Sequence, residues 1–138
     1  MRLSLFTDYG LRALMRLAGS PERALTTAQI ADEFHISRHH LTKVVRDLAE
    51  AGFVRTSRGA GGGLRLARPA GSITLGEVVR ALDRGKALVE GFRADGGTCI
   101  LTSRCRLKSR LAAARQAFLR ELDATTLAEC AYPGREAA

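Results

Sequence analysis

The chain has 138 residues, a formal net charge of +8 at pH 7 and a pI near 10.4. This length predicts one domain, or one domain with a small appendage, and such a chain buries a core without disulfide staples. Three cysteines are an odd number and argue against a secreted disulfide framework. We find no signal-peptide core after Met1 and no apolar run of membrane-spanning length, so we expect a cytoplasmic protein without a membrane partner.

The positive charge predicts a polyanionic partner. Aromatic residues make up only 5% of the chain and tryptophan is absent. Proteins that bind single strands stack bases on aromatic side chains, so this composition disfavours them. Double-stranded DNA is therefore the expected partner.

Three helices are predicted in the first 52 residues. The first starts with Thr7 as N-cap and ends at Gly19. The second starts at Thr26, which forms a capping box with Gln29, and the third is capped by Ser37 and stops at Gly52. The apolar stripe of the third helix consists of Leu41, Val44, Val45 and Leu48.

The pattern then changes to short strands. "FVRTSR" and "LRLARP" flank the turn "GAGGG", and Ser72 or Thr74 caps a fourth helix, "LGEVVRALD". Residues 84–104 lack periodicity and predict a loop. A long helix follows from about Cys105 to Asp123, and a short helical turn at "TTLAEC" precedes a polar tail. The apolar stripe of the long helix consists of Leu107, Leu111, Ala114, Phe118 and Leu122.

These elements predict a mainly α fold with a small β-hairpin wing. We expect residues 1–83 to form a winged helix-turn-helix, residues 84–104 a loop, and residues 105–138 a helix and tail. With its stripe in the core, the third helix turns polar side chains outward, and its N-terminus favours phosphate. The residues expected to contact DNA are Ser37, Arg38, His39, His40, Thr42, Lys43 and Arg46 of this helix and Arg55 and Arg58 of the wing.

The charge of this region supports the same interpretation. From Ile36 to Arg68 the sequence has seven Arg or Lys and only two acidic residues. The alternative is a solvated charged face, which applies most to Arg65 and Arg68. His35 is interpreted as a turn residue, and no histidine stands near the cysteines in a zinc-finger pattern.

Several stretches closely resemble a bacterial family of dimeric winged-helix repressors, many of which sense their signal through an iron–sulfur cluster. They are "FTDYGLRAL", "SRHHLTKVVRDLAEAGFVRTSRGAGGGLRLARP" and "ITLGEVVRALD". The stretch "CILTSRCRLKSRLAAARQAFLRELDATTLAE" is most similar to the NsrR-type nitric-oxide-sensing members. The resemblance covers the chain from Met1 to about Glu129. It implies a homodimeric repressor that binds palindromic operator DNA. The repressor releases this DNA when the cluster reacts with nitric oxide, or when the cluster responds to redox or iron status. The resemblance further implies that the loop at residues 84–104 is a sensor loop and that the helix within residues 105–138 is a dimerisation helix.

The resemblance also implies roles for particular residues. The long helix forms an antiparallel dimer interface, which its apolar stripe supports independently, because such a face must be buried somewhere. Cys99 and Cys105 are implied as ligands of the cluster at that interface, a 4Fe–4S in preference to a 2Fe–2S cluster, with Asp8 reaching across from the partner subunit. The family carries a further cysteine before a phenylalanine, where this chain has Gly91, and Asp95 is a nearby substitute ligand.

Other interpretations stay open. Cys99 and Cys105 also fit two buried thiols or a disulfide switch, and a carboxylate at Asp8 is stabilised by the helix dipole without any metal. A cofactor-free winged-helix regulator, controlled by a thiol switch or a protein partner, is therefore the alternative function. Cys130 lies outside the matched ligand positions and is interpreted as a surface or packing thiol. We expect no enzyme activity, because the sequence has no CxxC, nucleotide-binding glycine motif or nucleophile–base arrangement.

Overall fold

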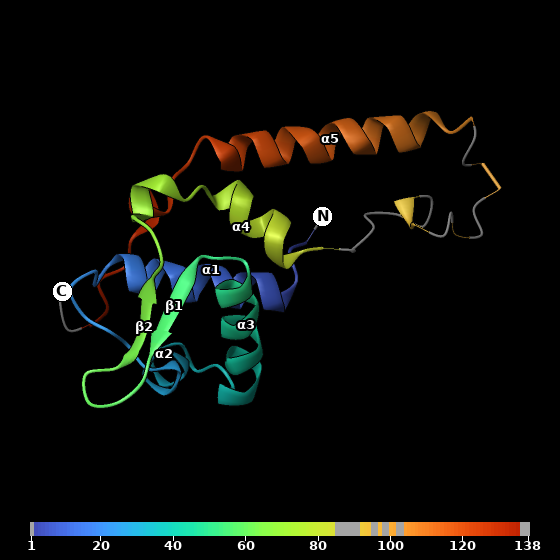
Figure 1. Ribbon diagram of the computed structural model, residues 1–138. Coiled ribbons are helices and arrows are strands. Elements are labelled where there is room, and N and C mark those ends of the chain that lie inside the picture. The colour runs from blue at the N-terminus through green and yellow to red at the C-terminus, as the bar shows by residue number, and fades with distance from the viewer. Residues whose placement is uncertain (1, 85–91, 95–96, 98–99, 102–103, 136–138) are drawn as a thin grey trace.

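The structure is a computed structural model that describes residues 2–84, 92–94, 97, 100–101 and 104–135. Figure 1 shows a small body of helices and one hairpin, with a long helix across its top. None of the helices in these ranges is long and apolar enough to cross a membrane. In chain order the elements are α1 (Leu5–Ala18), α2 (Thr27–Phe34), α3 (Arg38–Glu50), β1 (Val54–Ser57), β2 (Gly63–Leu66), η1 (Ala70–Ser72), α4 (Leu75–Leu82), α5 (Arg106–Asp123) and η3 (Leu127–Cys130).

The core forms where α1 crosses α3, α4 and β2. All four residues of the predicted α3 stripe are buried, which confirms that face of the helix. Leu14 and Leu17 of α1 are buried against this core, as is Leu64 of β2. Burial of these side chains from separate elements fixes the orientation of α3 relative to the hairpin.

Local capping explains most helix starts. Thr26 and Gln29 form the predicted capping box of α2, and Ser37 caps α3. The prediction of Thr7 as the N-cap of α1 is wrong, because Ser4 caps the helix and accepts a hydrogen bond from the Thr7 backbone N–H at 3.1 Å. The helix thus starts about one turn earlier, and Thr7 is buried inside it.

The predicted hairpin is confirmed. Strands β1 and β2 are antiparallel, with Val54 opposite Leu66 and Arg55 opposite Arg65. His35, the predicted turn residue, ends α2 in the left-handed conformation with a φ of 54°. In Figure 1 strand β1 lies between β2 and α3, so β2 is the outer strand of the wing.

Helix α5 packs beside α4, and its N-terminal part extends beyond the body in Figure 1. After α5 the chain returns to the body of the molecule. Leu127 is fully buried in the core, and its N–H donates to the Ile73 carbonyl at 2.8 Å. The final segment is not the polar tail we expected. The Tyr132 N–H donates to the Met15 carbonyl at 2.9 Å, and its ring lies 5.8 Å from that of Phe34. The Met15 carbonyl also accepts from the Gly19 N–H at 3.1 Å, so the Tyr132 N–H adds a second bond to it, while the aromatic ring buries apolar surface against Phe34.

Candidate DNA-binding face and sensor segment

The predicted DNA-contacting side chains share one property, which is that all of them are exposed. They are Ser37, Arg38, His39, His40, Thr42, Lys43, Arg46, Arg55 and Arg58. This follows from the helical period: burial of the apolar stripe of α3 leaves the remaining positions on the opposite face. Ser37 supports the N-terminal turn of α3 by accepting a hydrogen bond from the His40 N–H at 3.5 Å.

The cations on this face differ in how far they are neutralised. Arg38 pairs with Asp32 at 3.0 Å, and Arg46 lies 3.6 Å from Asp47 and 3.9 Å from Glu50. These pairs are solvent-exposed, and such pairs contribute little free energy, so exchanging the carboxylate for another anion would cost little. In the part of the chain that the structure describes, no carboxylate pairs with Lys43, Arg55 or Arg58. The face therefore carries net positive charge.

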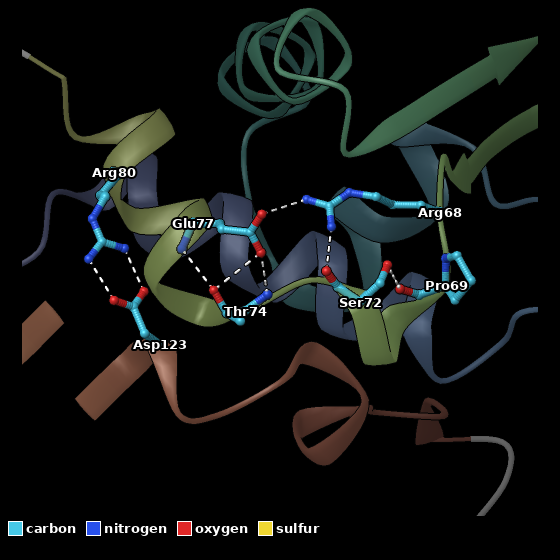
Figure 2. A network of polar contacts seen from close by, with 7 residues as sticks. All are labelled: Arg68, Pro69, Ser72, Thr74, Glu77, Arg80 and Asp123. Carbon is cyan, nitrogen blue, oxygen red and sulfur yellow. Dashed lines mark hydrogen bonds and ion pairs between the residues drawn. The ribbon is translucent and has the colours of Figure 1, made fainter. Parts of the chain in front are cut away.

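Arg68 has a different role from the cations above. Its guanidinium pairs with Glu77 at 2.9 Å and donates to the Ser72 carbonyl (Figure 2). It also lies 5.6 Å from the centre of the Phe53 ring. The backbone N–H of Thr74 donates to Glu77, and this bond, followed by the pair with Arg68, holds the pKa of Glu77 below its ordinary value. Arg68 thus fixes the end of the hairpin to the start of α4.

The other end of α4 is fixed to α5. The two terminal nitrogens of the Arg80 guanidinium, Nη1 and Nη2, donate to the Asp123 carboxylate at 2.5 and 2.7 Å (Figure 2). These hydrogen bonds raise the pKa of Arg80 and lower that of Asp123. Sequence reasoning missed this connection between the hairpin, α4 and α5. Its only local signal is Glu77 at the third helical position after Thr74, which is a capping-box pattern.

Cys105 is the N-cap of α5. Its half-buried thiol is free, and Sγ accepts a hydrogen bond from the Lys108 N–H at 3.4 Å. The ammonium of Lys108 lies 5.7 Å from the centre of the Phe92 ring, so Phe92 lies against the first turn of the same helix. Cys99 and Asp95, the other predicted ligands of this segment, and Gly91 lie outside the described residues.

Asp8 lies in the first turn of α1. Its carboxylate is 2.9 Å from Arg12 Nη2, and its side chain is 38% exposed. Within the described residues of one chain, no group of three or more His, Cys, Asp or Glu is placed to hold a metal ion. The predicted role of Asp8, as a ligand supplied by the partner subunit, stays a prediction.

The predicted dimer stripe on α5 is largely uncovered. Leu107 is 63% exposed and Ala114 is exposed, while Leu111, Phe118 and Leu122 are half-buried. Only Leu119 of this helix is buried against the rest of the chain. The stripe is thus an apolar face that the rest of the chain leaves partly uncovered. The dimer itself stays a prediction.

Comparison with known proteins identifies the family. Residues 3–132 match the Rrf2 family, described as an iron-dependent transcriptional regulator. The chain is 45% identical over 130 residues to the HTH-type transcriptional regulator NsrR of Geobacillus kaustophilus (strain HTA426), which covers 94% of this chain and 88% of that protein.

Two solved structures are similar throughout. The oxidized form of Staphylococcus aureus CymR has a TM-score of 0.72 and 30% identity, covering 93% of this chain and 94% of that one. T. potens IscR has a TM-score of 0.75 and 26% identity, covering 93% and 84%. These relatives are regulators and not enzymes, and their fold agrees with the winged helix-turn-helix described above. The chain belongs to the Rrf2 family of transcriptional regulators, as a homologue of NsrR.

Proposed function

We propose that this regulator is a cytoplasmic homodimeric repressor that binds palindromic operator DNA and releases it in response to nitric oxide, sensed through an iron–sulfur cluster. One observation carries the proposal. A face of exposed, partly unneutralised cations on α3 and the wing is joined, through α4, to a helix that begins with a free cysteine. The rest follows from the chemistry of those two ends.

The DNA-binding end supports duplex recognition. The N-terminal turn of α3 combines free backbone N–H groups with the exposed side chains of Arg38, His39 and Thr42. In helix-turn-helix proteins that end of the recognition helix contacts base edges in the major groove. A two-fold dimer presents two such helices, which predicts half-sites about one helical turn, roughly 34–36 Å, apart or a multiple of it.

The sensor end fits an iron–sulfur cluster in the type of donor it offers. Thiolates are the usual protein ligands of these clusters, and Cys105 has a free thiol at a helix N-terminus, where the dipole favours negative charge. We assign Cys99 and Cys105 as thiolate ligands, with a carboxylate from Asp8 of the partner subunit. Asp95 is the candidate in place of the side chain that Gly91 lacks. When bound, the cluster, preferably 4Fe–4S, supplies the iron with which nitric oxide reacts.

The chain's own residues provide the link between the two ends. Lys108 holds Cys105 at the start of α5, Asp123 near its end pairs with Arg80 of α4, and Glu77 at the start of α4 pairs with Arg68 of the hairpin. Displacement of α5 therefore acts on the hairpin through two ion pairs. Coupling requires that ligation favours one arrangement of these elements over another.

DNA binding is tested first. Duplexes selected from a randomised library by the anaerobically purified full chain provide the operator, and fluorescence anisotropy gives the Kd. Lys43→Ala and Arg46→Ala should weaken binding, and each lost phosphate contact lowers the slope of log affinity against log salt by about 0.9. Arg120→Ala, which removes an exposed charge on α5, is the matched control. Selection of no duplex would contradict the DNA-binding function.

The cluster is tested by its colour and composition. Anaerobically purified protein should be brown, with broad visible absorption, and should contain both iron and sulfide. Cys99→Ala and Cys105→Ala should bleach it, whereas Cys130→Ala should not. A colourless wild-type protein without iron would contradict the cluster and favour the cofactor-free regulator.

A further inference from the structure

A basic cavity lies on the outer side of the hairpin. It has a volume of about 300 Å³ and lies between the end of α1, the segment that follows it and strand β2 with the residues after it. Four arginines line it: Arg23, Arg55, Arg65 and Arg68. No Asp or Glu is among the lining residues, and the remainder are apolar or small apart from one serine. The cavity is thus strongly and uniformly positive.

The hairpin register brings two of these charges together. Arg55 and Arg65 are directly opposite each other in the antiparallel pair. Like charges at opposite positions destabilise a sheet, so this pairing has a cost in the isolated chain. Arg65 is held in place because its guanidinium donates to the Pro21 carbonyl at 3.3 Å.

Three of the four arginines have no acidic partner among the residues that the structure describes. In the described part of the chain, no carboxylate pairs with Arg23, Arg55 or Arg65, and only Arg68 has one, Glu77. Guanidinium groups match phosphate oxygens through paired hydrogen bonds, and a phosphate relieves the repulsion between Arg55 and Arg65. The chemistry of the cavity therefore corresponds to that of a phosphate group.

We propose that this arginine cavity is a phosphate-binding site, distinct from the recognition helix, which holds the backbone of operator DNA outside the half-site. This source of phosphate rests on the proposed function. The lining supports it, because α3 packs against β1, whereas the cavity is lined by β2, the residues after it and Arg55 of β1, with no residue of α3 among them. A free phosphate-bearing small molecule offers the same chemistry from another source.

Duplex length separates this site from the recognition helix. The selected palindrome is compared with the same duplex extended by about one helical turn on each side. The wild-type dimer should bind the longer duplex more tightly and with a steeper salt dependence. Arg23→Gln and Arg65→Gln should each reduce that difference, with a fall of about 0.9 in the log–log salt slope per lost contact. For each lost contact, raising the salt from 50 to 200 mM should therefore weaken binding of the longer duplex about 3-fold less in the variant than in the wild type.

Arg120→Gln is the matched control, because it removes an exposed charge from α5 and should keep the full length effect. Arg23 is exposed and forms no ion pair with the residues that the structure describes, so its variant keeps the experiment independent of folding at Arg65. An equal affinity and salt slope for both duplexes in wild-type protein would overturn the flanking-DNA site.

A second arm uses inorganic phosphate and pyrophosphate without DNA, at constant ionic strength, with the melting temperature as readout. Stabilisation of wild-type protein that Arg65→Gln abolishes, together with no length effect, identifies a free anion and overturns the DNA source. Absence of both effects overturns the phosphate site altogether while operator binding stands. If the wild type selects no duplex yet phosphate stabilises it, the proposed repressor function fails and the cavity stands as an anion site.

Discussion

Glu77 shows how one carboxylate joins two elements. Its Oε2 accepts hydrogen bonds from the backbone N–H of Thr74 at 2.8 Å and from the Thr74 hydroxyl at 3.2 Å, while Oε1 contacts Arg68. The same side chain therefore caps α4 and connects it to the end of the hairpin. The lowered pKa of Glu77 has the sign of a stabilising carboxylate: its contribution is present above the ordinary pKa of a glutamate and is lost as the pH falls.

Glu77→Gln should lower the melting temperature at pH 7 by about 1–4 °C, since glutamine keeps the cap acceptor and loses the exposed ion pair. The deficit should shrink only below the ordinary pKa of a glutamate, as the pH falls through the lowered pKa of Glu77 and the wild-type side chain becomes neutral. Thermal scans by circular dichroism from pH 7 to below pH 4 measure this. Glu121→Gln, at an exposed position of α5, is the control. A deficit that is constant over this range would contradict the assigned role.

The N-cap of α4 gives a second prediction at the residue scale. Thr74 accepts a hydrogen bond from the Glu77 N–H at 3.2 Å, and both halves of the capping box are present. Thr74→Ala should cost about 1 kcal/mol of unfolding free energy, whereas Thr74→Ser, which keeps the hydroxyl, should cost much less. Urea denaturation measures both. Equal losses for the two variants would show that the cap hydroxyl is not the cause.

At the scale of elements, α5 combines two roles on different faces. Leu119 packs against the body of the chain, while Leu107 is exposed near the N-terminal end that extends past α4 in Figure 1. An apolar stripe left in water is unfavourable, at about 25 cal/mol per Å² of exposed apolar surface. A second copy of α5, packed against the first, is the partner that we infer for it.

Leu107→Glu should therefore convert the dimer into a folded monomer of 14.9 kDa, because a charge buried in an apolar interface loses its hydration. Gln116→Glu places the same charge about 180° away on the helix and should leave the dimer intact. Sedimentation equilibrium distinguishes the two. A dimer that persists in Leu107→Glu would show that this stripe is not the interface.

At the scale of the whole molecule, most features that depend on residues close in sequence were predictable, and features that depend on residues far apart in sequence were not. The caps at Thr26 and Ser37 were predictable because each depends on residues within one helical turn, and the hairpin because its two strands flank a short glycine-rich turn. The start of α1 was not, since Ser4 and Thr7 are both competent N-caps. The return of the C-terminal segment was missed because it depends on Gly19, where a side chain would overlap the backbone of Tyr132, more than a hundred residues along the chain.

The same division holds for the candidate site. The exposed face of α3 follows from helical periodicity, and all the residues predicted there are exposed. The arginine cavity was not predicted, because the segment that carries Arg23 is joined to β2 by the non-local pairing of Leu25 with Leu64 and by the bond from Arg65 to the Pro21 carbonyl. The proposed sensor site takes Asp8 from a second chain, so the fold of one chain does not test that part of the prediction.

The central claim is that ligation at Cys105 controls DNA affinity. The direct measurement is the operator Kd of anaerobic wild-type protein before and after stoichiometric nitric oxide, beside Cys105→Ala and Cys130→Ala. We predict a loss of affinity of about 5–150-fold for the wild type and Cys130→Ala, and no response in Cys105→Ala. An operator affinity of the wild type that nitric oxide leaves unchanged would contradict the account.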